Sequence, residues 1–426
     1  MSGVSRVPSR YATLDRDRLA VLVPELLLCG QLMDRSGMAW CIEAWGREEM
    51  ARVAIEEWSA ASPVYTRRMQ RALGFEGSDV VTIFKGLQLD IGAPPQFMDF
   101  RYTVRDPWHG EFHLDHCGAL MDVEPMGERY VRSMCHDIED PTFDATAVAT
   151  NPRAQVRPVH RPPRTPADRH PHCAWTVTID DAFPAAVPSD ACLELLRSRA
   201  ATLELDPIDP ADDGAADYAG PLLSDVDFAA FSRSALARVA DEVVVQMQLL
   251  ALGFARAVSS RAGPEQARRM LTRALTGVAG ITAERLHRAL RLPAGAEGAL
   301  RLLELHPLLN PAAYVRARVE DGVLAVAPSP AHEDGGWLTL CGPGDPDAAR
   351  PLRAVVRAAD PLLDVRIEGS DTAWTLRLVS SSDLDPPSPE LEEVAVTRFS
   401  TGAAFAFGSR RSIPITPVPS RHRAPG

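Results

Sequence analysis

The segment RMQRAL at residues 68–73 returns as RLHRAL at residues 285–290, a shift of 217 residues (285 minus 68). The same shift aligns residues 14–75 with the second half of the chain without a gap. Further matches, the later ones after small gaps, are Glu25 with Glu242, Gly46 with Gly263, residues 87–89 with 303–305, residues 140–144 with 360–364, and residues 174–176 with 373–375. So many identities in one order predict two copies of one domain, each too long for a solenoid repeat.

Both copies follow one plan, with helices first and a sheet afterwards. In RLAVLVPELLLCGQLM (residues 18–33) and REEMARVAIEEW (residues 47–58), apolar residues recur at steps of three and four, which indicates amphipathic helices. FMDFRYTV (residues 97–104), GEFHLDHC (residues 110–117) and CAWTVTID (residues 173–180) alternate with period two, as half-buried strands do. We predict an α+β fold: a tandem duplication of a domain in which an N-terminal helical region precedes a mostly antiparallel sheet with one helix.

The chain of 426 residues is long enough for two domains. We assign residues 1–183 to the first copy and residues 223–408 to the second, and we expect the two copies to pack on each other. Residues 184–222 are acidic and rich in Asp, Pro, Ala and Gly, which suits a linker with one short helix. The tail, residues 409–426, has little to bury and is predicted to be flexible.

The composition bounds the partners and the compartment. A net charge of −12 and an isoelectric point near 5.4 argue against nucleic acid as the main partner, because phosphate binding needs a basic surface. The most apolar early run, LAVLVPELLLCG, is short and contains Pro24 and Glu25, so neither a signal peptide nor a membrane helix is expected. The seven cysteines are scattered irregularly, which favours reduced thiols. We therefore expect a cytoplasmic protein with no membrane partner.

Histidine and cysteine gather in one part of the first copy. Residues 109–173 hold seven of the 11 histidines and three of the seven cysteines, together with several carboxylates. This is the donor set that zinc or iron prefers. In the aligned second copy, Val355 and Val356 stand opposite Cys135 and His136, so the scaffold does not need these side chains. We expect an active first copy and a degenerate, pseudo-active second copy.

A strand and the helix after it carry the candidate metal ligands. Alternation over residues 108–117 places His113 and Cys117 on one face of a strand, and residues 127–139 are predicted to form a helix. If the two elements approach each other, two thiols and one imidazole form a three-ligand site with an open position for water. A solvent-facing strand and a plain core cysteine remain the alternatives. The predicted ligands of a divalent zinc or iron ion are His113, His116, Cys117, Cys135 and His136.

The predicted catalytic groups are Asp137 and Glu111, as proton shuttles, and Cys135, which could also act as a nucleophile if no metal is bound. Arg157 and Arg161, with His160 between them, follow in the densest basic run of an acidic chain. Two arginines aligned on an extended segment suit a carboxylate or phosphate, so we assign these three residues to substrate binding. A solvated basic loop is the alternative.

Two further residues have structural alternatives. Cys173 shares a strand face with Trp175 and is expected in the core. Lys85 is the only lysine in the chain, and it is either a base that arginine could not replace or an ordinary helix-surface residue.

The layout of the first copy has a counterpart among known families. A sheet segment ends in Cys117 (HCGAL), a helix follows with Cys135 (MCHDIED), and a last strand opens with Cys173 and Trp175 (HCAW). Over roughly residues 20–180, this layout resembles the L-2-amino-thiazoline-4-carboxylic acid hydrolase family. The resemblance implies ring-opening hydrolysis of a small cyclic, amidine-like amino acid. The histidine-rich strand, the Arg/Pro-rich insertion and the duplication depart from that family, so its substrate is not carried over.

We predict a metal-assisted hydrolase whose only active site lies in the first copy. Its substrate would be a small anionic metabolite, carboxylated and possibly cyclic, with a C–N or C–S bond to break. The alternatives are an iron-dependent redox enzyme of specialised metabolism and a non-catalytic module that binds a ligand or a metal.

Overall fold

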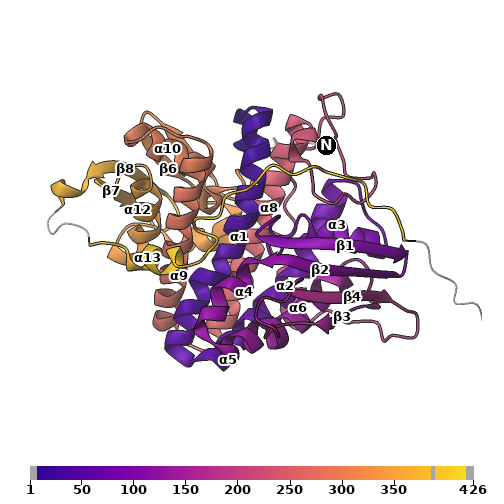
Figure 1. The fold of residues 1–426 in the computed structure, drawn as a ribbon. Helices are drawn as coiled ribbons and strands as arrows, with labels where there is room; N and C mark the ends of the chain where they lie inside the picture. Colours follow the sequence, from indigo (N-terminus) through magenta and orange to yellow (C-terminus); the bar gives the residue numbers. More distant parts are fainter. Residues whose placement is uncertain (1–6, 385–388, 419–426) are drawn as a thin grey trace, which may run out of the picture.

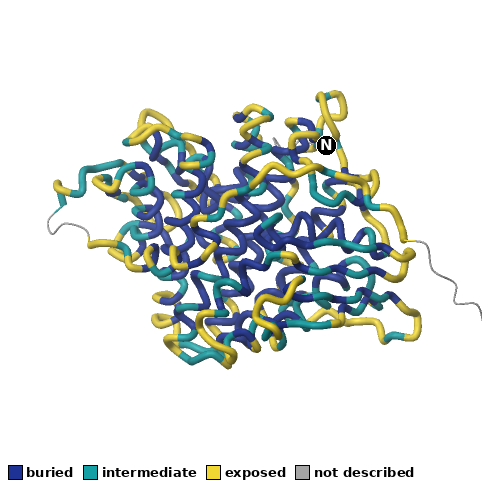
Figure 2. Tube along the Cα trace, in the orientation of Figure 1, coloured by how far each residue is buried: buried dark blue, intermediate teal, exposed yellow. Residues whose placement is uncertain are grey.

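Four long helices form the centre of the molecule, and a four-stranded sheet lies on each side of them (Figure 1). The structure is a computed structural model, which describes residues 7–384 and 389–418. The long helices are α1 (Arg16–Trp45), α2 (Arg47–Ala72), α8 (Arg233–Ser259) and α9 (Pro264–Ala289). Figure 2 shows them as a continuous buried band between the sheets.

Local sequence signals set the ends of these helices. The Asp15 side chain accepts a hydrogen bond from the backbone N–H of Arg18 at the start of α1, and Ser232 does the same for Ala235 at the start of α8. The two caps are separated by the 217 residues of the internal match (232 minus 15). Gly46 has a φ of 82° between α1 and α2, a conformation that favours glycine.

The long helices pack between the halves more extensively than within them, α1 against α9 and α2 against α8. Two buried ion pairs cross this interface, Arg68 Nε with Glu242 at 2.9 Å and Arg285 Nη2 with Glu25 at 2.7 Å. Each pair takes its arginine from the second long helix of one half and its glutamate from the first long helix of the other. This reciprocal exchange is the contact pattern of an isologous, two-fold interface.

The two sheets share one strand order. The first contains β1 (Met98–Asp106), β2 (His109–Cys117), β3 (Ala154–His160) and β4 (Cys173–Ile179) in the order β1-β2-β4-β3. The second contains β5 (Ala317–Glu320), β6 (Val323–Val326), β7 (Leu363–Gly369) and β8 (Trp374–Ser380) in the order β5-β6-β8-β7. All neighbouring strands are antiparallel, which confirms the predicted α+β class and the antiparallel sheets.

Shorter helices complete each half. The first has α3 (Val80–Leu87), α4 (Gly118–Val123), α5 (Glu128–Arg132), a π-helical segment η3 (Ser133–Ile138) and α6 (Glu139–Val148). The second has α10 (Ala296–Leu305), α11 (Pro330–Asp334), α12 (Arg350–Arg357) and α13 (Glu392–Arg398). The helix predicted over residues 127–139 is present, but it continues through the π-helical segment to Val148.

The later part of the sequence self-comparison is wrong in register. Residues 140–144 lie in α6, whereas their matched residues 360–364 lie in a turn and at the start of β7. The segment between the second and third strands is equally long in both halves, residues 118–153 and 327–362, which places residues 140–144 opposite residues 349–353 rather than 360–364. Val355 and Val356 in α12 are therefore not the structural counterparts of Cys135 and His136 in the π-helical segment.

The predicted linker contains one short helix, α7 (Asp190–Leu195), and packs closely on the first half. Lys85 on α3 is buried, and its ammonium donates to the backbone oxygens of Tyr218 at 2.7 Å and Gly220 at 2.5 Å. The same ammonium lies 4.7 Å from the centre of the Tyr218 ring. The only lysine of the chain thus ties the linker to α3, which is a structural role.

The segment after α13 returns from the second half to the first, visible as the yellow trace that ends beside β1 in Figure 1. Arg410 donates to Asp99 at 2.6 Å, Pro414 bridges to Leu223, and the backbone N–H of Val418 donates to Val104 at 2.9 Å. Residues 409–418 thus have backbone and arginine bonds to the first half that the prediction of a flexible tail, which considered only what the tail could bury, did not include. Residues 419–426 lie outside the described residues.

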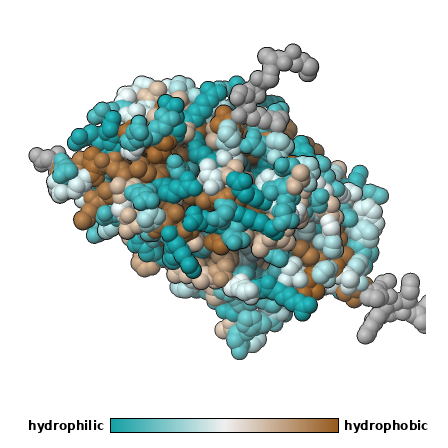
Figure 3. Space-filling view, turned by 90° about the horizontal axis from the view of Figure 1, so that it is seen from above, coloured by the Kyte–Doolittle hydropathy of each residue, from teal (hydrophilic) through white to brown (hydrophobic). Residues whose placement is uncertain are grey.

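Within the described part of the chain, no helix is long and apolar enough to cross a membrane. Seen from above, hydrophilic side chains cover much of the surface, with apolar ones gathered toward the end that carries the second half (Figure 3). Leu362 and Phe399 are among the exposed large apolar residues of that half.

Candidate active site

The predicted strand with histidines is present as β2, but its faces differ from the prediction at one end. His113 lies on the outer face and contacts Asp115, with 3.3 Å between Nε2 and Oδ1. Cys117 is buried, because the chain turns there into α4 and its sulfur accepts a hydrogen bond from the backbone N–H of Leu120 at 3.3 Å. His113 and Cys117 therefore do not share a face, contrary to the prediction.

The two other predicted imidazole ligands lie elsewhere. His116 packs between Phe97 and Phe405, and burial lowers its pKa. His136 bonds through Nε2 to the backbone oxygen of Pro162 at 2.7 Å. Among residues 7–384 and 389–418, no group of three or more His, Cys, Asp or Glu side chains is arranged to hold a metal ion. A zinc or iron site remains a prediction without a ligand set.

Three thiols surround one buried carboxyl group. Burial, followed by the charge of Glu139, raises the pKa of Cys117, Cys135 and Cys173, and that of Cys117 lies at about 12. Cys173 is buried in β4, as predicted for a core position. Protonated thiols are weak nucleophiles, so this environment does not favour catalysis by Cys135.

The predicted proton shuttles and arginines are engaged at the surface. Glu111 accepts from Arg105 at 2.7 Å, and Asp137 lies 3.4 Å from the hydroxyl of Ser133. The arginines bond to carboxylates of the segment from η2 (Glu124–Met126) to α6: Arg157 to Asp144, Arg161 to Asp140, and Arg164 to Glu124. His160 has a lowered pKa through burial, and its Nδ1 has no hydrogen-bond partner among the described residues. These side chains do not converge on one cavity.

A cavity of about 80 Å³ lies instead between α1, α2, α3 and the helices that follow β2. Three buried carboxyl groups line it, from Asp34 on α1, Asp90 after α3, and Glu139 at the start of α6. The other polar lining residues are Gln31, Trp58, Ser62, Thr142 and Thr146. None of Asp34, Asp90 and Glu139 is among the catalytic groups predicted from the sequence.

The three carboxyl groups are held differently. Asp34 accepts from the indole of Trp58 at 3.2 Å and from Arg35 at 3.1 Å. Asp90 accepts through Oδ1 from the Tyr65 hydroxyl at 2.9 Å and from the Gly92 N–H at 2.7 Å. As far as the described residues go, Asp90 Oδ2, Glu139 Oε2 and Gln31 Oε1 are buried without a hydrogen-bond partner. These unpaired acceptors are available to a molecule in the cavity.

Burial raises the pKa values of two of these carboxyl groups by different amounts. It raises the pKa of Asp90 from 3.8 to about 6, against the opposing bonds from Gly92 and Tyr65. It raises the pKa of Glu139 from 4.5 to about 8, although Arg161 opposes the shift. At neutral pH, Asp90 is therefore mainly ionised and Glu139 mainly protonated. A pair of carboxyl groups tuned apart in this way can supply a base and an acid.

The second half lacks two of these carboxyl groups at the matched positions. Ala251 stands opposite Asp34 (251 minus 34 is 217), and His306 stands opposite Asp90, one residue after the matched leucines Leu89 and Leu305. His306 is buried, donates through Nε2 to the Ala279 oxygen at 3.0 Å, and accepts from the Leu308 N–H at 3.0 Å. The sequence therefore held a signal for Asp34 and Asp90, since both are acidic in only one half.

Comparisons of the chain with protein-family models, with curated proteins and with solved structures found no match. The resemblance to the thiazoline-carboxylate hydrolase family thus stays a prediction, and the cavity itself must carry the functional argument.

Proposed function

We propose that the first half is a hydrolase with an acid–base active site in the carboxyl-lined cavity. The observation that carries the proposal is the pairing of Asp90, whose pKa is about 6, with Glu139, whose pKa is about 8, around one cavity with unpaired oxygens. Asp90 takes a proton from water as it attacks a carbon–nitrogen centre, and Glu139 donates its proton to the leaving nitrogen. The substrate carbon gains the oxygen, and the nitrogen leaves with the added proton.

The lining also bears on the substrate. Three carboxyl groups disfavour an anion inside the cavity, so we revise the expected small anionic substrate to a neutral or cationic one with N–H groups. Gln31 Oε1, with no partner among the described residues, and Asp34 would accept those N–H groups. About 80 Å³ holds roughly six water-sized groups at ~10–15 Å³ each, which fits a small amide, lactam or cyclic amidine.

We also infer that the chain arose by tandem duplication and that the second half is not catalytic. The shared strand order, the equivalent caps at Asp15 and Ser232, and the reciprocal ion pairs support the duplication. Ala251 and His306 in place of Asp34 and Asp90 support a non-catalytic second half. The reduced state of all seven cysteines suits the cytoplasm.

The test uses a panel of small cyclic amidines, lactams and primary amides, with ring opening or ammonia release followed by NMR. Asp90→Asn and Glu139→Gln should each lower kcat by about 10²–10⁴-fold for any substrate found. Glu76→Gln, at an exposed glutamate, is the matched control. Loss of turnover in Glu111→Gln and Asp137→Asn, with Asp90→Asn and Glu139→Gln fully active, would move the site back to the surface residues.

A measurement that needs no substrate accompanies this panel. Carboxyl carbon NMR of the unmodified protein should show one group titrating near pH 6 and another near pH 8. Asp90→Asn should remove the first signal and Glu139→Gln the second. Titration of both groups near their ordinary pKa values would contradict the acid–base assignment.

A further inference from the structure

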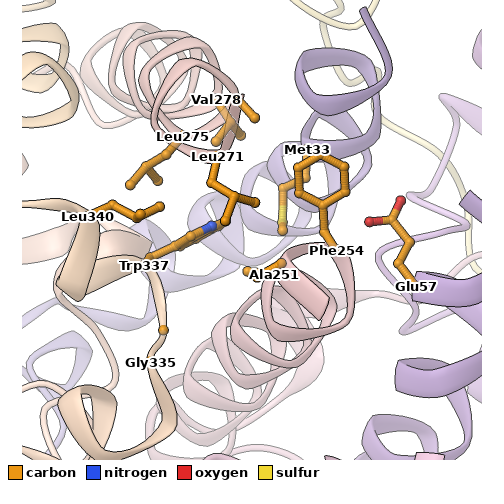
Figure 4. A pocket seen from close by; sticks show the side chains of 13 residues that line it. Met33, Glu57, Ala251, Phe254, Leu271, Leu275, Val278, Gly335, Trp337 and Leu340 are labelled. Atoms are coloured by element: carbon orange, nitrogen blue, oxygen red, sulfur yellow. The ribbon is translucent and has the colours of Figure 1, made fainter. Parts of the chain in front are cut away.

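A second cavity lies where the two halves meet, bounded by α8, α9 and the short helix η6 (Trp337–Leu340), with α1 and α2 opposite (Figure 4). Its volume is about 40 Å³. Apolar side chains form most of the lining, among them Met33, Phe254, Leu275 and Trp337. The only charged side chain among the lining residues is Glu57, which reaches the cavity from α2.

This cavity occupies the place in the second half that the carboxyl-lined cavity occupies in the first. Under the shift of 217 residues, Ala251 corresponds to Asp34 and Leu275 to Trp58 (251 minus 34, 275 minus 58), and each pair lines its own cavity. The second half has thus kept the hollow while losing the carboxyl groups. The one carboxyl group that remains is supplied by the other half.

Glu57 is held in place and one of its oxygens is unsatisfied. Its exposed fraction is 3%, and Oε1 has no hydrogen-bond partner within the described part of the chain. Figure 4 shows the carboxyl group turned toward Phe254. The helices approach closely here, since a Cβ on Gly253 of α8 would lie 3.2 Å from the Glu57 Cα. Burial, and then the charge and hydrogen bond of Asp34, raise the pKa of Glu57 well above its usual value.

We propose that this second cavity binds the ammonium group of a small alkylamine. Glu57 would accept an N–H bond through its free oxygen, and the neighbouring charge of Asp34 would favour a cation. The faces of Phe254 and Trp337 attract cations, and the aliphatic walls accommodate the alkyl chain. An anion would meet the carboxyl group of Glu57 and no basic side chain among the residues that line the cavity.

The size of the cavity sets the size of the ligand. About 40 Å³ holds roughly three water-sized groups at ~10–15 Å³ each, which matches the three non-hydrogen atoms of ethylammonium. So small a ligand binds no more tightly than roughly the millimolar range. The proposal does not depend on the acid–base function of the first cavity, because Glu57 and Trp337 take no part in that chemistry.

Ethylammonium chloride is the probe, and the indole N–H resonance of Trp337, assigned by Trp337→Phe, is the reporter. Titration should shift this resonance with saturation in the millimolar range, whereas ethanol, with the same number of non-hydrogen atoms, should bind at least tenfold more weakly. Glu57→Gln should weaken the amine at least tenfold, because glutamine cannot ionise and pair its negative charge with the ammonium group. It should not unfold the protein, since glutamine matches the protonated acid in shape. Glu76→Gln, at an exposed site, should change nothing.

Three results would overturn the proposal: no saturable shift with ethylammonium, equal affinity for ethanol, or unchanged amine affinity in Glu57→Gln. Thermal unfolding of Glu57→Gln shows whether that variant is folded, and filling the cavity by Ala251→Met is the second way to remove the site. Asp90→Asn should leave amine binding intact. Failure of hydrolysis with intact amine binding, or the reverse, separates the two proposals.

Discussion

The two halves build the same cavity with opposite linings. In the first half, Asp34 and Asp90 place carboxyl groups at positions where the second half has Ala251 and His306. The second half shows what the fold requires there, namely apolar packing and a histidine that satisfies backbone groups. Buried carboxyl groups raise the free energy of the folded state at neutral pH, so their presence in one half only points to use rather than to packing.

The largest expected effect on stability concerns the buried ion pairs, to which both halves contribute. Arg285→Met removes the partner of Glu25 and also the donor to the backbone oxygens of Gly402, Ala403 and Phe405. A buried glutamate left unpaired should cost roughly 3–5 kcal/mol of the free energy of unfolding, measured by urea denaturation. Arg68→Met should cost less than Arg285→Met, since Glu242 also pairs with Arg238 at 2.9 Å and keeps that partner.

A surface pair is the control for this experiment. Arg269 and Glu265 are paired on the exposed face of α9, so Arg269→Met should cost less than about 1 kcal/mol. The double variant Glu25→Gln with Arg285→Met should recover part of the loss, because no buried charge is left. If Arg285→Met proved as mild as Arg269→Met, the buried ion pair with Glu25 would not be the stabilising contact between the halves that we expect.

The next largest effect concerns the pH dependence of stability, which should have opposite signs for a buried group in each half. Burial lowers the pKa of His306 from 6.5 to about 4, so its contribution to stability is present above pH 6.5 and is lost as the pH falls toward 4. The pKa of Asp90 is raised from 3.8 to about 6, so its contribution is present below pH 3.8 and is lost as the pH rises through 6. At ~1.4 kcal/mol per pKa unit, each change amounts to about 3 kcal/mol.

Urea denaturation from pH 4 to pH 8 tests both signs. His306→Gln should flatten the acid side of the stability profile, because glutamine can still donate and accept without titrating. Asp90→Asn should raise stability on the alkaline side. Parallel shifts of the two variants, in the same direction at every pH, would show that the two positions do not differ in the way proposed.

Much of the scaffold could be predicted from the sequence because it depends on local periodicity. The apolar steps in α1 and α2 and the alternation in β2 indicated the class of each element and where it begins. Both helices run past the quoted stretches, to Trp45 and Ala72. The prediction failed where tertiary structure decides: Cys117 leaves its expected face because the strand turns into a helix. Gapped comparison beyond residue 75 misplaced residues 140–144, since the short sequence matches there did not keep the equal spacing of β2 to β3 and of β6 to β7.

The candidate site was harder to predict for a different reason. Asp34, Asp90 and Glu139 lie on separate elements and converge only through packing, so no spacing in the sequence connects them. The dense His/Cys segment was more conspicuous, although its side chains mostly pair with close neighbours. The ungapped self-comparison contained the better signal, a carboxyl group matched to alanine at Asp34, which needed the structure to show that it faces a cavity.

The smallest expected effect on stability concerns the surface carboxylates that stand out in the sequence but do not line the cavity. Glu111→Gln and Asp137→Asn change exposed or partly exposed carboxylates whose bonds are to Arg105 and Ser133. Each should alter the free energy of unfolding by no more than about 0.5 kcal/mol and leave its pH dependence unchanged, because solvent already screens these charges. Urea denaturation at neutral and acidic pH is the measurement. A change as large as the one expected for Asp90→Asn would contradict the contrast between solvent-screened surface carboxylates and the buried ones of the cavity.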